Sequence, residues 1–170
     1  VQLLYHQGKN IYTAENHTLY YARLPQAVKH HFDFKPLLVL SDTNSFSGRL
    51  ASDPYGQMII PDRENLHVFR ADKEIFRTPS NYPDLAEGLL FTSDHKLCVV
   101  FRGIGLVWYT LHPEQPNQYL QKQAEFVNEL EGASPRCAAI DSSDIIWLGT
   151  RSHGLLGYSY QQGKLEKKFQ

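Results

Sequence analysis

The residues of this chain best suited to hold a charged ligand are two arginines in equivalent places. Arg102 follows the apolar run 97–101, and Arg151 follows the run 145–150, which lies 49 residues further along. A guanidinium presents a rigid fork of N–H donors, and each charge-assisted hydrogen bond contributes about 1.5 to 3 kcal/mol where water is excluded. The pair is therefore a candidate clamp for one carboxylate or sulfate. The alternative is that both arginines are solvated residues at strand ends.

Other polar side chains stand in comparable turns and complete the set of candidate ligand contacts. Histidine is a common metal ligand, but no cluster of further ligands accompanies any histidine of the set. The sequence therefore predicts no metal site, no cofactor and no catalytic residue. The candidate ligand-binding residues are Arg102, Arg151, His153, Asp62, Arg63, Asn65 and His17.

A second group of carboxylates lies in or beside the turns that precede these strands. Short carboxylates in turns accept hydrogen bonds from nearby backbone amides, which fixes the local backbone. We predict this structural role, and no catalysis, for Asp53, Asp94, Asp141 and Asp144.

An internal repeat positions all of these turns. The last copy has short strands at 138–140, 145–150, 155–158 and 164–169, separated by polar or glycine-containing turns. The preceding copy aligns with it at a spacing of 49 residues, so that Arg102 falls on Arg151 and Gly105 falls on Gly154. The second copy lies 40 residues before the third, and the first copy lies 47 residues before the second. Spacings of this size are typical of four-stranded propeller blades.

The repeat predicts an all-β fold, a β-propeller made of four-stranded antiparallel blades. Four blades are expected, at about 1–34, 48–79, 88–123 and 135–170, with the helix-like segment 121–130 as a connector. Trp147 is expected to act as an apolar wedge between neighbouring sheets. The other structural repeat positions are Gly149, Gly154 and Gly105, and Gly154 is expected to supply a positive φ in its hairpin.

Residues 140–150, followed by Gly154, Leu155 and Tyr158, closely resemble the repeat of two-component regulator propellers. The resemblance is strong in the last copy and weak in the first two, where Asn10 and Met58 replace the tryptophan. It implies the extracytoplasmic sensor region of a hybrid histidine kinase of the Bacteroidetes type, located in the periplasm as part of an inner-membrane protein. It also implies a propeller of about seven blades, of which this chain supplies four.

In a propeller, the hairpins between second and third strands open onto one face, together with the links between blades. The candidate ligand-binding residues would gather there. The expected ligand is an oligosaccharide or another small polar molecule. The expected protein partners are the remaining blades and a second protomer.

Composition excludes several other classes of function. A net charge of -1, from 17 basic and 18 acidic residues, gives no electrostatic footprint for nucleic acid. No apolar stretch approaches the roughly 20 residues of a membrane span, so we expect no membrane contact by this segment.

Two alternatives to a ligand-sensing domain stay open. One is an interaction or dimerisation scaffold without direct ligand binding, and the other is a propeller lyase or lactonase.

Overall fold

The computed structural model describes residues 3–7, 10–15, 17–24, 33–40, 46, 49–79, 86–102, 105–126, 130 and 132–169. Within them every regular element is a β-strand, apart from the 3₁₀ turn Pro116–Gln118. The strands are β1 (Leu3–Gln7), β2 (Asn10–Glu15), β3 (Thr18–Arg23), β4 (Lys35–Val39), β5 (Ala51–Ser52), β6 (Met58–Pro61), β7 (Asn65–Arg70), β8 (Lys73–Pro79), β9 (Ala86–Phe91), β10 (Lys96–Phe101), β11 (Gly105–Leu111), β12 (Leu120–Phe126), β13 (Pro135–Ile140), β14 (Ile146–Thr150), β15 (Leu155–Gln161) and β16 (Lys164–Phe169).

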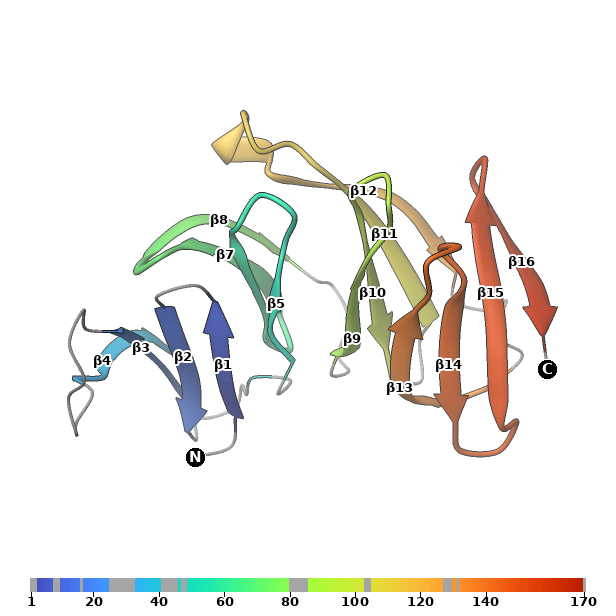
Figure 1. Cartoon of the computed structure of the whole chain (residues 1–170), viewed down its shortest axis with the longest axis horizontal. Helices are drawn as coiled ribbons and strands as arrows, with labels where there is room; N and C mark the ends of the chain where they lie inside the picture. Colours follow the sequence, from blue (N-terminus) through green and yellow to red (C-terminus); the bar gives the residue numbers. More distant parts are fainter. Residues whose placement is uncertain are drawn as a thin grey trace. The chain divides into compact units, whose positions relative to one another are not determined.

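These strands form four separate four-stranded sheets, each an antiparallel meander in chain order (Figure 1). The sheets are β1–β4, β5–β8, β9–β12 and β13–β16, and neighbouring strands in each pair antiparallel. The all-β prediction of four four-stranded blades is therefore confirmed. The chain divides into two compact units, residues 1–80 and 81–170, and each unit contains two sheets.

In the first unit, the core lies between sheets β1–β4 and β5–β8. Tyr12 and Leu19 of the first sheet share a cluster with Met58, Ile60 and Phe69 of the second. These side chains alternate along their strands, as expected where one face of a strand packs on a neighbouring sheet. The Tyr12 hydroxyl also donates to the carbonyl of residue 71 at 3.0 Å, which links the first sheet to the β7–β8 turn.

In the second unit, sheets β9–β12 and β13–β16 pack face to face, with β13 beside β9 (Figure 1). The third sheet contributes Cys98, Val100, Leu106 and Trp108 to the shared core. The fourth sheet contributes Ile146, Leu148, Leu156 and Tyr158, all at most 2% exposed. Cys98 is a buried free thiol, as expected, and burial raises its pKa.

Two blades extend further than the sequence indicates. The fourth strand of the first blade is β4, which lies beyond the expected limit at residue 34. The segment expected as a connector contains β12, which pairs with β11 and ends at Phe126 rather than at 123. Its Leu120 and Phe126 are buried, and the residues between them are mostly exposed. Pairing with β11 therefore outweighs the near-helical spacing of its apolar residues.

Trp147 lies on the outer face of its own sheet, so its expected role as a wedge toward a neighbouring sheet stays a prediction. The core-facing side chains of β14 are Ile146 and Leu148, both fully buried, whereas Trp147 points to the opposite face and is half-buried. Its ring stacks on Phe169 of the same sheet, with centroids 5.1 Å apart. Its indole N–H donates to Asp141 at 2.8 Å. The tryptophan thus braces the outer face of its own sheet, and no wedge between described sheets involves it.

The repeat glycines have the backbone roles expected of them. Gly154 has a φ of 69° in the β14–β15 hairpin, a conformation that L side chains rarely adopt. A Cβ on Gly149 would lie 2.5 Å from the Cys137 sulfur, so this position requires close approach between β13 and β14. Gly105 opens β11 with a φ of 149°.

Candidate functional site

Arg102 is not a free clamp for a ligand. Its guanidinium Nε donates to Oε1 of Glu87 at 2.5 Å, and the two side chains form an ion pair within the third sheet. Glu87 is buried, at 8% exposure, so the arginine neutralises a carboxylate that would otherwise be costly to bury. The expected convergence of the two arginines stays a prediction.

The β14–β15 hairpin, by contrast, presents its polar residues to solvent. Arg151 and His153 are both exposed, and the backbone N–H of Arg151 donates to the carbonyl of Ser134 at 3.2 Å. The His153 N–H donates to the Thr150 hydroxyl at 3.0 Å, and its ring Nδ1 lies 2.9 Å from the Ser152 hydroxyl. The backbone of this hairpin is fixed, and its arginine is available for a ligand.

The first unit holds the other candidates, and Asp62 is the one that differs most from expectation. It is 1% exposed, so it cannot form part of a solvent-facing rim. Its carboxylate oxygen accepts from the N–H groups of Glu64 and Asn65, each at 2.6 Å, because the β6–β7 turn needs an acceptor for them. Arg63 is exposed at the tip of this turn, and Asn65 begins β7.

His17 lies in the β2–β3 turn and is half-buried. Its carbonyl accepts a hydrogen bond from the N–H of Leu40 at 2.8 Å, which ties the end of the fourth strand to the turn. The structure therefore gives His17 a role in its own sheet. The suggestion that it contacts a ligand stays a prediction.

A buried ionic network, which the sequence does not reveal, runs through the second sheet. The ring of His67 lies between two carboxylates: Nε2 is 2.8 Å from Asp62 Oδ2, and Nδ1 is 2.7 Å from Glu74 Oε1. Arg77 extends the network with two hydrogen bonds to Glu74: its Nε donates to Oε1 at 2.8 Å and its Nη2 donates to Oε2 at 2.7 Å. Four ionisable residues on β7, β8 and the β6–β7 turn are thereby linked in one row.

The carboxylates of this network have depressed pKa values. Burial alone would raise the pKa of Asp62, but hydrogen bonds from His67 and from two backbone N–H groups hold it below its ordinary value. Burial acts in the same direction on Glu74, where hydrogen bonds from Arg77 and His67 likewise lower the pKa. Both carboxylates are thus ionised acceptors at neutral pH. The network supports the structure of the blade, with Asp62 and His67 buried at one end and Arg77 exposed at the other.

The turns between first and second strands carry a recurring hydrogen-bond pattern. Asp53 accepts from the N–H groups of Tyr55 and Gln57 at 2.9 and 2.8 Å, and Asp141 accepts from those of Ser143 and Ile145 at 2.8 and 3.0 Å. This confirms the structural role predicted for both aspartates.

In the third sheet, Thr92 replaces the aspartate and its hydroxyl accepts from the N–H of Lys96 at 3.0 Å. The same hydroxyl donates to Asp94, which also pairs with Lys96. Asp94 therefore bonds to two side chains of its own turn, and it also accepts a backbone hydrogen bond, as the sequence suggested. Its pKa is lowered, because the bonds from Lys96 and Thr92 outweigh the effect of burial.

One of these turns also joins two sheets. Asp144, in the β13–β14 turn, accepts from both the N–H and the hydroxyl of Ser93, in the β9–β10 turn. Asp144 has a φ of 58°, and His95, at the matching position 49 residues earlier, has 62°. The left-handed conformation directs the Asp144 carboxylate out of its own turn and toward the neighbouring blade.

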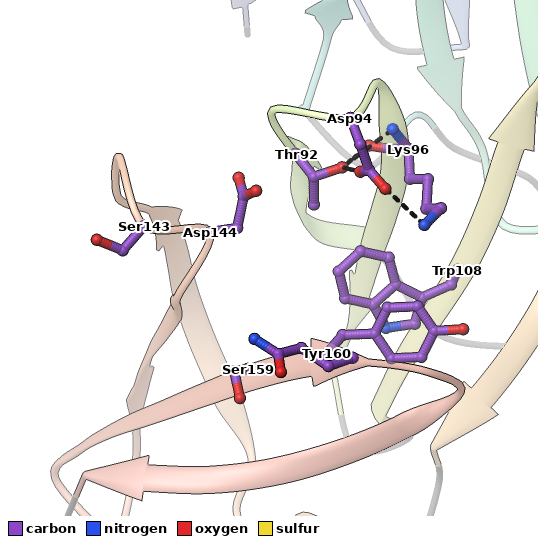
Figure 2. A pocket seen from close by; sticks show the side chains of 9 residues that line it. Thr92, Asp94, Lys96, Trp108, Ser143, Asp144, Ser159 and Tyr160 are labelled. Atoms are coloured by element: carbon purple, nitrogen blue, oxygen red, sulfur yellow. Dashed lines mark hydrogen bonds and ion pairs between the residues drawn. The ribbon is translucent and has the colours of Figure 1, made fainter.

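Beside this contact lies a pocket of about 150 Å³ within the second unit. Figure 2 shows the stacked rings of Trp108 and Tyr160 on one side of it, with Asp94 and Lys96 above them and Asp144 on the other side. The full lining is Thr92, Asp94, Lys96, Trp108, Ser143, Asp144, Ser159, Tyr160 and Gln161. None of these residues is among the candidate ligand-binding residues that the sequence indicates. Trp108 and Tyr160 lie on the third strands of their blades, and the aromatic character of these strands in the repeat could have pointed to them.

The described residues hold no group of three or more histidine, cysteine, aspartate or glutamate side chains placed to bind a metal ion. They also contain no helix with the length and hydropathy that a membrane span requires. The second pocket, in the first unit, is lined by Tyr21, Ala22, Arg23, Asp33, Lys35 and Asp72.

No protein-family model matches the sequence, and no curated protein matches it either. Solved structures do. The β-propeller domain of Cps50 (Swd1) from Myceliophteria thermophila has a TM-score of 0.73 at 12% identity, over 93% of this chain and 54% of that one. The chain has a β-propeller fold. A candidate 6-phosphogluconolactonase from Bacteroides uniformis gives a TM-score of 0.72 at 15% identity, over 97% of the propeller chain and 52% of the enzyme.

The extracellular domain of a candidate hybrid two-component system from B. thetaiotaomicron is also similar. It has a TM-score of 0.63 at 15% identity, and the match covers 99% of the propeller chain but 22% of that domain. The propeller chain therefore spans about half of the first two proteins and about a fifth of the third. At these identities the likenesses establish the fold, and they confirm the resemblance to two-component regulator propellers at the level of architecture.

Proposed function

We propose that this chain is the ligand-recognition part of the extracytoplasmic propeller domain of a two-component sensor histidine kinase, and that its ligand is a carbohydrate. The observation that carries the proposal is the likeness of 99% of the chain to the extracellular domain of a hybrid two-component system. The repeat sequence at 140–150 supports it independently. The proposal places the chain in the periplasm as part of an inner-membrane protein.

The exposed β14–β15 hairpin is the proposed contact with the ligand. It offers one guanidinium, Arg151, and the ring of His153 on a backbone fixed by hydrogen bonds. Arg63 and Asn65 lie at the corresponding hairpin of the second sheet, and the expectation that they contact a ligand stays a prediction. A fixed backbone reduces the entropy lost when such side chains bind.

Calorimetric titration of the chain with a panel of oligosaccharides tests the proposal. Arg151→Glu should abolish the heat of binding for any ligand that the intact chain binds. Lys164→Glu makes the same charge change at the exposed first residue of β16 and should leave binding intact. Failure of every glycan class to bind would overturn the proposal.

The main alternative is a propeller scaffold that transmits the signal or mediates dimerisation, while another domain binds the ligand. The ion pair of Arg102 with Glu87 and the burial of Asp62 favour it, because they remove two polar groups from the expected rim. In cells that carry the full sensor, this alternative predicts that signalling survives Arg151→Glu. The ligand-binding proposal predicts that signalling is lost.

We propose no enzymatic activity for the chain. A lyase or lactonase of this fold would need histidines and carboxylates that converge on a metal ion, and the described residues contain no such group. A panel of lactone and uronate substrates assayed with added divalent metals would reveal an activity that contradicts this.

We further propose that the outer face of the fourth sheet packs against another four-stranded blade. In the third sheet, the equivalent positions 98 and 108 are at most 1% exposed because the fourth sheet covers them. In the fourth sheet, the same face carries the Trp147–Phe169 stack over Gly157, and Phe169 is 50% exposed. An apolar face of this kind is stable in water when another sheet covers it.

A further inference from the structure

The third and fourth sheets share a β-bulge in their first strands. The ladder between β9 and β10 skips Glu87, which lies between two paired residues of β9. The ladder between β13 and β14 skips Arg136 in the same way. In such a bulge the extra residue has no cross-strand partner, and the bulge re-aims a side chain. Both bulges stand opposite the end of the second strand, so the two blades have the same backbone arrangement at this place.

An arginine follows the second strand at each bulge. Arg102 lies 15 residues after Glu87, and Arg151 lies 15 residues after Arg136 (151 − 136 = 15). In the third sheet the two side chains meet, since Arg102 Nε donates to Glu87 Oε1 at 2.5 Å. In the fourth sheet the start of β13 lies beside the end of β14 in the same way (Figure 1). The side chains of Arg136 and Arg151 are therefore within reach of one another.

The fourth sheet thus has two positive charges where the third sheet has an ion pair. Arg136 and Arg151 are both exposed, and among the described residues no side chain pairs with either guanidinium. Two like charges at this separation repel, and an anion between them removes the repulsion. The equivalent place in the third sheet is filled by a carboxylate, that of Glu87. Two guanidinium forks match the two oxygens of a carboxylate.

The backbone around these arginines is held by the protein itself. The N–H of Arg151 donates to the carbonyl of Ser134 at 3.2 Å, so β13 and β14 stay joined beyond the bulge. The Thr150 hydroxyl donates to the carbonyl of Gly154 at 2.8 Å and closes the hairpin. A ligand therefore has to order only the two arginine side chains, which limits the entropy lost on binding.

We propose that Arg136 and Arg151 form a clamp for the carboxylate of a uronic acid. The clamp gives the chemical class of the ligand at the β14–β15 hairpin, and its sugar component rests on the function proposed above. Arg136 takes the place that the sequence assigned to Arg102, because Arg102 is already neutralised by Glu87.

Arg136→Glu tests whether the two side chains meet, because it restores the charge pattern of the third sheet. Its carboxylate should pair with Arg151 as Glu87 pairs with Arg102, and the urea midpoint should rise by about 0.1 to 0.5 M. In the Arg151→Glu background the same change brings two carboxylates together, so the midpoint should fall. Tryptophan fluorescence measures both shifts in the second unit. A shift of the same sign in both backgrounds would contradict the clamp.

Arginine Nε–H signals in ¹H–¹⁵N spectra test the binding. Those of Arg136 and Arg151 should shift together and saturably on titration with sodium glucuronate at millimolar concentrations and constant ionic strength. Glucose and the methyl ester of glucuronate, which are neutral, should cause no shift. The Arg102 signal is the internal control and should stay in place, since its Nε–H already donates to Glu87. Arg136→Lys and Arg151→Lys assign the two signals.

The variants separate the clamp from other causes of a shift. Arg136→Glu should abolish the response of Arg151 to glucuronate, because its own carboxylate occupies the clamp, whereas Lys164→Glu should retain it. An unchanged response in Arg136→Glu would overturn the proposal, as would equal shifts with glucose. Acetate at the same concentration should act more weakly than glucuronate, and equal shifts with acetate would overturn the assignment to a sugar.

The clamp and the sensor role fail in different ways. If calorimetry detects no oligosaccharide while glucuronate still shifts both arginine signals, the sensor role is contradicted and the clamp stands. If an oligosaccharide binds and Arg136→Glu leaves its affinity unchanged, the clamp is contradicted and the sensor role stands.

Discussion

Asp144 and Ser93 tie the two sheets of the second unit together through two hydrogen bonds. The Ser93 N–H donates to Asp144 Oδ1 at 2.8 Å, and the Ser93 hydroxyl donates to Oδ2 at 2.5 Å. The contact joins two turns that are 51 residues apart in sequence, at the edge of the pocket. It fixes the spacing between the Trp108 wall and the opposite side of that pocket.

Loss of this contact should destabilise the second unit measurably. We expect Ser93→Ala to lower the free energy of unfolding by about 1 kcal/mol, the usual value of one hydrogen bond to a side chain. Asp144→Asn keeps a residue that tolerates positive φ but leaves a single acceptor oxygen for the two donors of Ser93. Urea unfolding followed by tryptophan fluorescence reports this unit, because both tryptophans lie in it.

A double-mutant cycle isolates the Ser93–Asp144 interaction from other effects of each change. The coupling energy should be about 0.5 to 1.5 kcal/mol, as for hydrogen-bonded neighbours. Ser152→Ala paired with Asp144→Asn should show no coupling. If the unfolding free-energy changes of Ser93→Ala and Asp144→Asn were strictly additive, the role of this contact would be contradicted.

The network around His67 should make the stability of the first unit dependent on acid. The pKa values of Asp62 and Glu74 are lowered from ordinary values of 3.8 and 4.5. The unfolded chain therefore binds more protons than the folded chain as pH falls, and the stabilisation is complete only above these ordinary values. Stability should decline as pH falls from about 4.5 through the folded-state pKa values.

Asp62→Asn tests this prediction. At pH 7 it should lower the free energy of unfolding by about 2 kcal/mol, because it removes a charged acceptor from His67. At pH 3 its cost should be smaller, because the Asp62 carboxyl of the unfolded wild-type chain is then largely protonated and must release its proton on folding. Circular dichroism in urea measures both values. Asp72→Asn, at an exposed aspartate, is the control and should not change the free energy of unfolding at either pH. If the cost of Asp62→Asn did not depend on pH, the stabilising role of the network would be contradicted.

A side chain at Gly149 would meet one neighbour. A Cβ there would lie 2.5 Å from the sulfur of Cys137, but this cysteine is exposed and can turn away, so Gly149→Ala should cost about 1 kcal/mol. Cys137→Ala should rescue most of that loss in the double variant. Gly154→Ala provides the comparison, because nothing lies within 4 Å and its cost comes from a φ of 69° alone. Cys137→Ala should not rescue it.

The sequence reveals the strand pattern well because the repeat is local. Spacings of polar turns and short apolar runs locate the second and third strands of every blade, and Gly154 has the predicted positive φ. The fourth strands are less well located. Residues 120–126 have an apolar spacing close to that of a helix, and only pairing with β11 decides the structure.

The side-chain contacts could not be predicted from one sequence, since they depend on partners distant along the chain. The face on which Trp147 lies follows only from the burial of Ile146 and Leu148 in the core, since alternation along β14 has no reference in the sequence alone. Arg102 has the expected position, but Glu87 is 15 residues away and neutralises it. The pocket combines turns from two blades, so no single stretch of sequence contains it.

Calorimetry of the intact chain against a broad oligosaccharide panel tests the ligand-sensing role most directly. The account predicts saturable binding of at least one oligosaccharide, abolished by Arg151→Glu and retained in Lys164→Glu. Absence of binding across all glycan classes by a folded, monomeric chain would contradict it, as would binding that both charge reversals leave unchanged.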